Sequence, residues 1–239
     1  MNDRFAQKVV LVAGGTGGLG RAVSEAFLDA GATVVVTYRS QGEWDELVRG
    51  VPDAGARLVG RQVDVTDEAA VARTVEEIVA GHGRIDALCN SVGGYAGGVK
   101  LWELQTAVLD RMLSLNLRSG YALMHAVAPV MLRQRQGSIV NVAAKAAFEH
   151  PAEAAAYAAS KAAAVAMIAS LAAELAGSGV RVNSIVPSII DTETNRKAMP
   201  KANFARWPKP QDIARVVLFL CSDEAKAVHG AAIPVDGFS

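Results

Sequence analysis

The sequence contains few cysteines and histidines, and their spacing excludes several kinds of site. The two cysteines, Cys89 and Cys221, lie far apart and form no CxxC pair. Such lone thiols are more typical of buried side chains in a reducing compartment than of a disulfide framework. The four histidines are scattered without metal-ligand spacing, so we expect no metal site.

The chain also lacks an excess of charge of either sign. Lys and Arg number 24, as do Asp and Glu, so the formal net charge is zero. Without a basic footprint we expect neither a nucleic acid nor a membrane as a partner. The N-terminal residues contain no apolar signal core, and the first apolar run, VVLVAG, is too short to cross a membrane. Together with the lone thiols, these features predict a cytoplasmic protein.

No internal repeat and no low-complexity linker divides the chain. Its 239 residues suit one α/β domain, and a composition of 51% hydrophobic and 20% charged residues is that of a globular protein. We therefore expect a single domain over residues 1–239.

Strand-like apolar runs alternate with helical patterns along almost the whole chain. Strands are predicted over 8–13, 32–38, 57–64, 85–91, 138–143, 180–187 and 231–236, and helices over 18–30, 67–80, 106–133, 153–176 and 210–222. Nearly continuous Val, Ile and Leu strands between helices indicate a parallel sheet covered on both faces. The pattern predicts an α/β fold with one doubly wound, Rossmann-type parallel sheet, whose ligand binds at the carboxyl ends of the strands.

A glycine-rich loop follows the first predicted strand. Gly14, Gly18 and Gly20 form G-x-x-x-G-x-G, with Thr16 and Leu19 between them. The missing side chains let the backbone turn tightly and approach a pyrophosphate at a helix N-terminus. The alternative is a glycine-rich turn without a ligand, but the strand-loop-helix context favours a dinucleotide site.

The end of the second strand bears on the choice of cofactor. An acidic residue there would hold the adenosine ribose hydroxyls, but Tyr38 occupies this place and Arg39 and Ser40 follow. An arginine without a competing carboxylate suits the 2′-phosphate of NADP(H). We therefore expect NADP(H) to be preferred over NAD(H). The preference is expected to be moderate, because position 17 in the glycine loop is Gly17 rather than a second basic residue. The alternative is that Arg39 is a solvated loop residue.

Tyr157 and Lys161 lie four residues apart in AAAYAASKAAA. This spacing places both side chains on one helix face. A nearby cation favours the phenolate and lowers the pKa of the tyrosine, which suits a proton donor near neutral pH. Taken alone the pair is also compatible with a core tyrosine and a solvated lysine.

Together, these motifs resemble the short-chain dehydrogenase/reductase family over essentially the whole chain. The glycine loop is followed in order by Asp64, Asn90-Ser91-Val92-Gly93, Asn116, Tyr157-x-x-x-Lys161 and the segment Arg181-Val182-Asn183-Ser184-Ile185-Val186-Pro187-Ser188. The resemblance implies that Tyr157 exchanges the proton, that Lys161 holds the nicotinamide ribose, and that Asn116 shapes the active-site helix and a water relay. It also implies further cofactor contacts at Asp64, Val65, Asn90, Ser91, Val92, Pro187 and Ile190.

Position 144 departs from the family pattern. The family's carbonyl-orienting serine lies thirteen residues before the tyrosine, and this sequence has Ala144 there, beside Ala143. Three interpretations follow. The substrate does not need this hydrogen bond, another group such as Tyr95, Lys145 or His150 supplies it, or the protein binds nucleotide with little catalysis.

Three stretches, 93–98, 143–147 and 191–200, resemble dihydropteridine reductases. Those relatives also lack the serine and keep the tyrosine and lysine, and their substrate is a conjugated quinonoid dihydropterin. Tyr95 and Trp207 are then candidates to stack on a flat heterocycle, the alternative being that both are packing residues. These reductases generally look built for NADH, whereas Tyr38 and Arg39 favour NADPH. The substrate predicted is a C=N or C=O compound, and the segment 188–207 is predicted to act as a lid.

The helix predicted over 153–176 is expected to have a surface of small side chains, formed by Ala155, Ala156, Ala159, Ala163 and Ala166. Small residues permit close helix approach, so we expect a homotetramer or homodimer that uses this helix. The alternative is a helix packed only within its own subunit.

Overall fold

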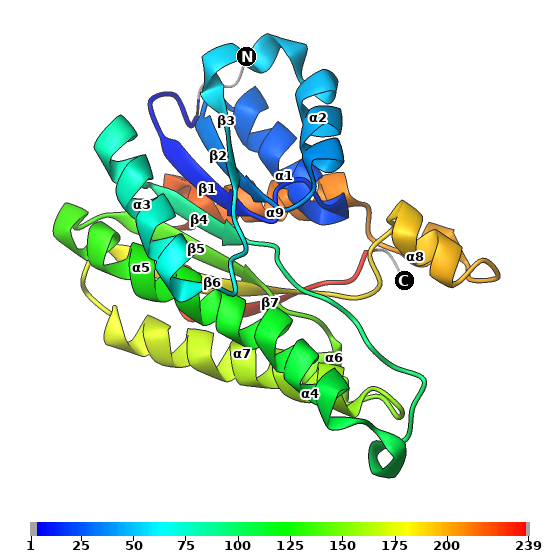
Figure 1. Cartoon of the computed structure of the whole chain (residues 1–239). Coiled ribbons are helices and arrows are strands. Elements are labelled where there is room, and N and C mark those ends of the chain that lie inside the picture. The colour runs from blue at the N-terminus through cyan, green and yellow to red at the C-terminus, as the bar shows by residue number, and fades with distance from the viewer. Residues whose placement is uncertain (1–3, 238–239) are drawn as a thin grey trace.

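A seven-stranded sheet in which every pairing is parallel forms the centre of the protein, in the order β3-β2-β1-β4-β5-β6-β7 (Figure 1). The structure is a computed structural model that describes residues 4–237. The strands are β1 (Val9–Ala13), β2 (Thr33–Tyr38), β3 (Leu58–Gln62), β4 (Ala87–Asn90), β5 (Gly137–Val142), β6 (Val180–Pro187) and β7 (Ala232–Val235). The chain moves outward from β1 to β3 and then returns to β4 on the other side of β1. The carboxyl ends of β1 and β4 therefore form the switch point at which ligands bind in such sheets.

Helices cover both faces of the sheet (Figure 1). They are α1 (Gly18–Asp29), α2 (Gln41–Gly50), α3 (Glu68–His82), α4 (Thr106–Leu113), α5 (Ser119–Gln134), α6 (Ala146–Glu149), α7 (Ala155–Glu174), α8 (Glu193–Ala198) and α9 (Pro210–Cys221). The predicted doubly wound α/β fold is confirmed, and each predicted strand end lies within two residues of the observed one.

Successive side chains of β1 point to opposite faces of the sheet, and this explains why the core has two layers. Val10 and Val12 pack on one face with residues of α1 and α9, such as Phe27 and Val217. Val9 and Leu11 point to the other face, into a cluster built with α3, α5 and α7. Because successive strand residues face opposite sides, one apolar strand supplies both cores.

The helix predicted over 106–133 is not continuous. A π-helical turn, Ser114–Arg118, separates α4 from α5. Such turns insert an extra residue into a helix and are frequent at functional sites. Three helices, α2, α6 and α8, are absent from the sequence prediction. Within α2 only Leu47 is buried, so its apolar pattern is too weak to signal a helix.

Helix α7 lies on one side of a helical layer, beside α4 and α5 (Figure 1), and carries Tyr157 and Lys161. Its length and composition would suit a membrane span, but it packs against β6 and α4 and buries residues including Lys161 and Ile168. These are the features of the core helix of a globular domain. Ala156 is buried inside the subunit, so its predicted place on the helix surface is wrong; the other four predicted alanines are at least partly exposed.

Candidate functional site

The glycine-rich loop joins β1 to α1 at the switch point. Gly14 has a φ of 71°, which glycine adopts without strain. A Cβ on Gly20 would collide with the carbonyl oxygen of Gly14, so glycine is required for this close approach. Helix α1 has no side-chain cap and no acidic residue in its first turn. Its N–H groups are therefore available to a phosphate, and the cradle fits a dinucleotide.

The end of β4 is fastened to this loop. The Ser91 hydroxyl donates to the carbonyl of Ala13 at 2.7 Å. The Asn90 amide donates to Asn141 on β5 at 2.9 Å, and its oxygen accepts from Val92 N at 3.2 Å. These bonds fix the backbone of 90–92 beside the glycine loop.

Tyr38, Arg39 and Asp64 come together at the outer end of the loop. The Tyr38 ring stacks on Trp44 of α2, with 5.1 Å between ring centroids. Asp64 accepts hydrogen bonds from the Thr66 N–H and hydroxyl at 2.9 and 2.8 Å. These bonds lower the pKa of Asp64, and the attraction of Arg39 adds to the effect. Val65 is buried behind them.

Lys161 and Tyr157 lie one helical turn apart and border the segment after β4. The Nζ of Lys161 is buried and donates to the carbonyl of Val142 at 2.9 Å. A Cβ on Gly93 would lie 3.1 Å from this nitrogen. The ring of Tyr157 meets Tyr95 edge to face, with 5.0 Å between centroids. The predicted pair thus lies at the carboxyl end of β5, beside the nucleotide cradle.

The expectation that Lys161 lowers the pKa of Tyr157 is wrong for this structure. Burial raises the pKa of Tyr157 to about 12, and the neighbouring Tyr95 adds to the rise. Burial also lowers the pKa of Lys161 to about 8. Loss of hydration disfavours the charged form of each residue.

Asn116 lies in the π-helical turn and links three segments. Its Oδ1 accepts from Gly94 N at 2.9 Å, and its Nδ2 donates to Gly94 O at 3.0 Å. The same Nδ2 donates to the Ser160 hydroxyl at 3.0 Å, one residue before Lys161. Asn116 therefore ties the segment after β4 to Ser160 on α7.

The three residues predicted as alternatives to a hydroxyl at position 144 lie in different places. The ammonium of Lys145 lies 3.3 Å from carboxylates of both Glu149 and Asp236, and these bonds raise its pKa. His150 ends α6 with a φ of 50° and lines a hollow together with Trp102. The ring of Tyr95 contacts that of Tyr157. Ala144 itself is buried and offers no donor.

The segment 188–207 begins beside the glycine-rich loop, and its later residues pack against one another. A Cβ on Gly18 would lie 2.8 Å from the methyl group of Thr192, so the base of the segment touches the glycine loop. Trp207 packs on Phe204, with 5.0 Å between ring centroids. The two aromatic residues proposed to hold a heterocycle thus have separate partners. At the start of this stretch, Pro187 accepts from Lys145 N at 3.0 Å, and Ile190 packs on the core.

The sequence did not single out Ser160, Glu43 or Thr192. The sequence does contain a signal for Ser160, because a polar residue three places after Tyr157 lies on the same side of the helix. Glu43 has a weaker signal. Its carboxylate accepts a hydrogen bond from the Thr16 hydroxyl at 3.0 Å, across a separation of 27 residues.

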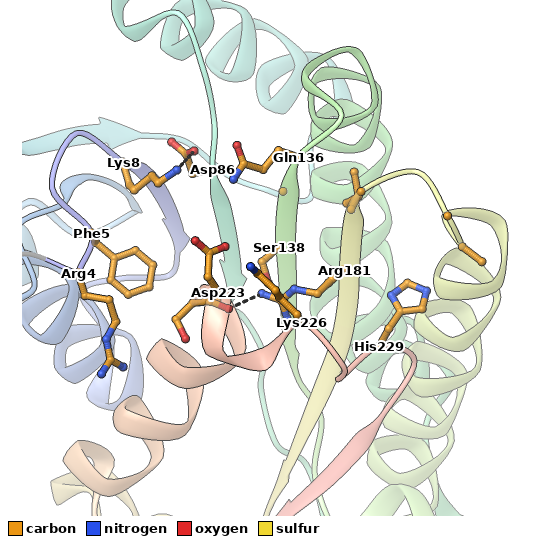
Figure 2. A pocket seen from close by; sticks show the side chains of 17 residues that line it. Arg4, Phe5, Lys8, Asp86, Gln136, Ser138, Arg181, Asp223, Lys226 and His229 are labelled. Carbon is orange, nitrogen blue, oxygen red and sulfur yellow. Dashed lines mark hydrogen bonds and ion pairs between the residues drawn. The ribbon is translucent and has the colours of Figure 1, made fainter.

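A second hollow, of about 480 Å³, opens at the opposite edge of the sheet (Figure 2). It is lined by residues at the amino ends of the strands, including Lys8, Asp86 and Arg181. Three of its charged groups have partners in the protein: Lys8 and Asp86 pair at 3.4 Å (Figure 2), and Arg181 donates to the Ser222 carbonyl at 2.9 Å. Ligands of doubly wound sheets bind at the other edge, so this hollow is not part of the candidate site.

Sequence comparison identifies the family. The profile described as short chain dehydrogenase matches residues 8–203. The chain belongs to this family. It is accordingly an oxidoreductase, and the family uses NAD(P)(H).

Several characterised short-chain dehydrogenases are similar to it over nearly their full length. The 3-oxoacyl-acyl-carrier-protein reductase FabG of Thermotoga maritima is 34% identical, over 98% of this chain and 98% of the relative. D-threitol dehydrogenase of Mycolicibacterium smegmatis is 35% identical, over 98% of this chain and 93% of the relative.

Solved structures agree with this assignment. A short-chain type dehydrogenase/reductase from Mycobacterium ulcerans superposes with a TM-score of 0.92 at 29% identity, covering 98% of this chain and 90% of the other. ElxO with NADP bound has a TM-score of 0.91 at 26% identity, covering 96% and 97% of the two chains. NAD⁺-bound xylitol dehydrogenase has a TM-score of 0.91 at 27% identity, covering 98% and 99%. Structures similar to this chain thus include one with NADP bound and one with NAD⁺ bound.

Proposed function

We propose that this short-chain dehydrogenase reduces a C=O or C=N group of a small molecule with NADPH. The observation that carries the proposal is the gathering of Tyr157, Lys161 and Asn116 beside the glycine cradle. When bound, the nicotinamide supplies the hydride. Tyr157 delivers the proton to the substrate oxygen or nitrogen.

Each of the other two residues has a distinct part. The Lys161 ammonium holds the nicotinamide ribose, and it remains mostly protonated at neutral pH because its pKa is about 8. A bound ligand that brings positive charge beside Tyr157 offsets the effect of burial and lowers the pKa of the phenol. Asn116 positions the backbone of Gly94, as its three hydrogen bonds to Gly94 and Ser160 support.

The preference proposed is for NADP(H) over NAD(H). It rests on Arg39 at the end of β2, on Tyr38 in the place of the usual carboxylate, and on Ser40 as a further hydroxyl at this turn. Asp64 and Val65 border the adenine, and 90–92, Pro187 and Ile190 border the rest of the cofactor. The segment 188–207 is proposed as the lid over the substrate.

Two substrate classes are compared: conjugated, pteridine-like compounds, and ketones or aldehydes. Ala144 and the exposed aromatic face of Tyr95 favour a conjugated, pteridine-like compound. The similar enzymes include a 3-oxoacyl-acyl-carrier-protein reductase and a D-threitol dehydrogenase, and these two activities favour a ketone or aldehyde. In that case Tyr95 is the proposed substitute donor, since its ring contacts that of Tyr157 while Lys145 is engaged by two carboxylates; its hydroxyl, which lies over Gly97, would have to turn toward the substrate. The third possibility, a nucleotide-binding regulator with little activity, leaves the Tyr157–Lys161–Asn116 arrangement unexplained.

The test is consumption of NADPH and of NADH with quinonoid dihydropterin and with a panel of ketones, aldehydes and quinones. Tyr157→Phe should lower turnover by at least about 100-fold while NADPH still binds, because it removes only the proton donor. Full turnover of Tyr157→Phe would disprove the mechanism. NADPH binding without turnover of any compound would favour the regulator.

A homotetramer or homodimer is also proposed, as is a cytoplasmic location. The exposed surface of α7 includes Ala159 and Ala166, and Trp102 stands 78% exposed beside its N-terminal half. An apolar patch of this kind is typical of a subunit interface. Light scattering that gave a monomer at micromolar concentration would contradict the oligomer.

A further inference from the structure

We propose that Glu43 determines cofactor specificity, because its carboxylate binds the adenosine ribose of NAD(H) and opposes the 2′-phosphate of NADP(H). This proposal rests on the proposed nucleotide site and concerns the strength of the preference that Arg39 provides. It assigns to a residue of α2 the part that a carboxylate at the end of β2 plays in other dinucleotide folds.

The orientation of Glu43 is the first observation. Ser40 is the N-cap of α2, and its hydroxyl accepts from Glu43 N at 3.4 Å. A serine followed three residues later by a glutamate is the capping-box pattern, in which the glutamate returns to the N-cap N–H. Here the carboxylate turns outward instead and accepts from the Thr16 hydroxyl at 3.0 Å. A local bond is thus replaced by one that reaches the phosphate-binding loop.

The surroundings of this bond are the second observation. Thr16 belongs to the loop between Gly14 and Gly18, and Arg39 immediately precedes the N-cap of α2. The carboxylate therefore lies between the glycine loop and the end of β2, which is where the adenosine ribose binds in this fold. Tyr38 and Trp44 stack against each other next to it and keep the N-terminal turn of α2 close to the strand end.

The chemistry of the two cofactors differs at this point. A ribose 2′-hydroxyl donates a hydrogen bond to a carboxylate, whereas a 2′-phosphate has charged acceptor oxygens and is repelled by it. Glu43 is exposed, so solvent screens this repulsion. For solvent-screened charges about 5–6 Å apart, with an effective dielectric constant of about 40–80, the expected effect on affinity is about 3- to 10-fold. Arg39 attracts the same phosphate, so the two residues oppose each other and the wild-type preference is modest.

Nucleotide binding tests the proposal without any substrate. Isothermal titration calorimetry would measure the affinity of the full chain for adenosine 2′,5′-bisphosphate and for 5′-ADP. Glu43→Gln keeps the shape of the side chain and removes its charge. It should tighten binding of the 2′,5′-bisphosphate by about 3- to 10-fold, with 5′-ADP unchanged or weaker. Glu46→Gln is the matched control: Glu46 lies on the same helix, but it pairs with Arg21 at 3.0 Å. It should leave the ratio of the two affinities unchanged.

Two outcomes would overturn the proposal in different ways. If both nucleotides bind and Glu43→Gln has the same affinity ratio as the wild type and Glu46→Gln, Glu43 has no role in specificity and the nucleotide site stands. If neither nucleotide binds to any variant, the nucleotide site itself is wrong, and the proposed function fails with it. Arg39→Ala should shift the ratio the other way, toward 5′-ADP.

Discussion

Replacing Lys161 with Met should make the protein more stable at neutral pH while it removes activity. Lys161 is 6% exposed, and burial lowers its pKa from 10.5 to about 8. Its ammonium has one hydrogen bond, to the Val142 carbonyl, and no ion pair within residues 4–237. A charge buried without a counter-ion reduces the free energy of unfolding.

The size of the effect follows from the two pKa values. A difference of about 2.5 pH units corresponds to about 3 kcal/mol. Met fills a similar volume, and losing the bond to Val142 costs about 1 kcal/mol. The net gain is about 2 kcal/mol, which for a protein of this size raises Tm by about 4–8 °C.

The gain should depend on pH in a defined direction. Below pH 8 the lysine is charged in both the folded and unfolded states, and the full cost of burial is present. Between pH 8 and 10.5 the unfolded state binds more protons, so the stability of the wild type rises with pH. Above 10.5 both states are neutral and the advantage of Lys161→Met disappears.

Chemical denaturation from pH 7 to 10.5 would measure this, with NADPH consumption as the activity assay. Lys197→Met is the control, because Lys197 is 74% exposed and pairs with Glu193 on the surface, where such pairs contribute little. A Lys161→Met protein less stable than the wild type at pH 7, or a gain that does not change with pH, would refute the reasoning.

Two further predictions concern the cradle and the missing serine. Gly20→Ala should abolish nucleotide binding and lower Tm, since its Cβ would meet the Gly14 carbonyl, whereas Gly81→Ala, in open space on α3, should be neutral or stabilise by up to about 1 kcal/mol. If Tyr95 supplies the lost hydrogen bond to a ketone, Tyr95→Phe should lower kcat by about 10²-fold with little change in KM, and adding Ala144→Ser should restore it. An unchanged kcat for Tyr95→Phe would exclude that role.

Much of the fold was predictable because it depends on local pattern. The apolar runs and their alternation with helical periods gave the seven strands and the doubly wound class. The helix of 106–133 was not predicted correctly, because the residues of its π-helical turn have ordinary helical composition. Asn116 adopts that turn within a network that involves Gly94 and Ser160, which are distant in sequence.

The sequence by itself determined the parts whose physics acts over a few residues. These are the glycine loop after a strand, the one-turn spacing of Tyr157 and Lys161, and the absence of a hydroxyl at Ala144. Only the tertiary structure decided the remaining features. Burial raises the pKa of Tyr157, which is the reverse of the expected shift. The ring of Tyr95 packs against the ring of Tyr157. The tertiary structure also brings the Glu43 carboxylate to Thr16. Each of these depends on packing between segments far apart in the chain, which no local spacing encodes.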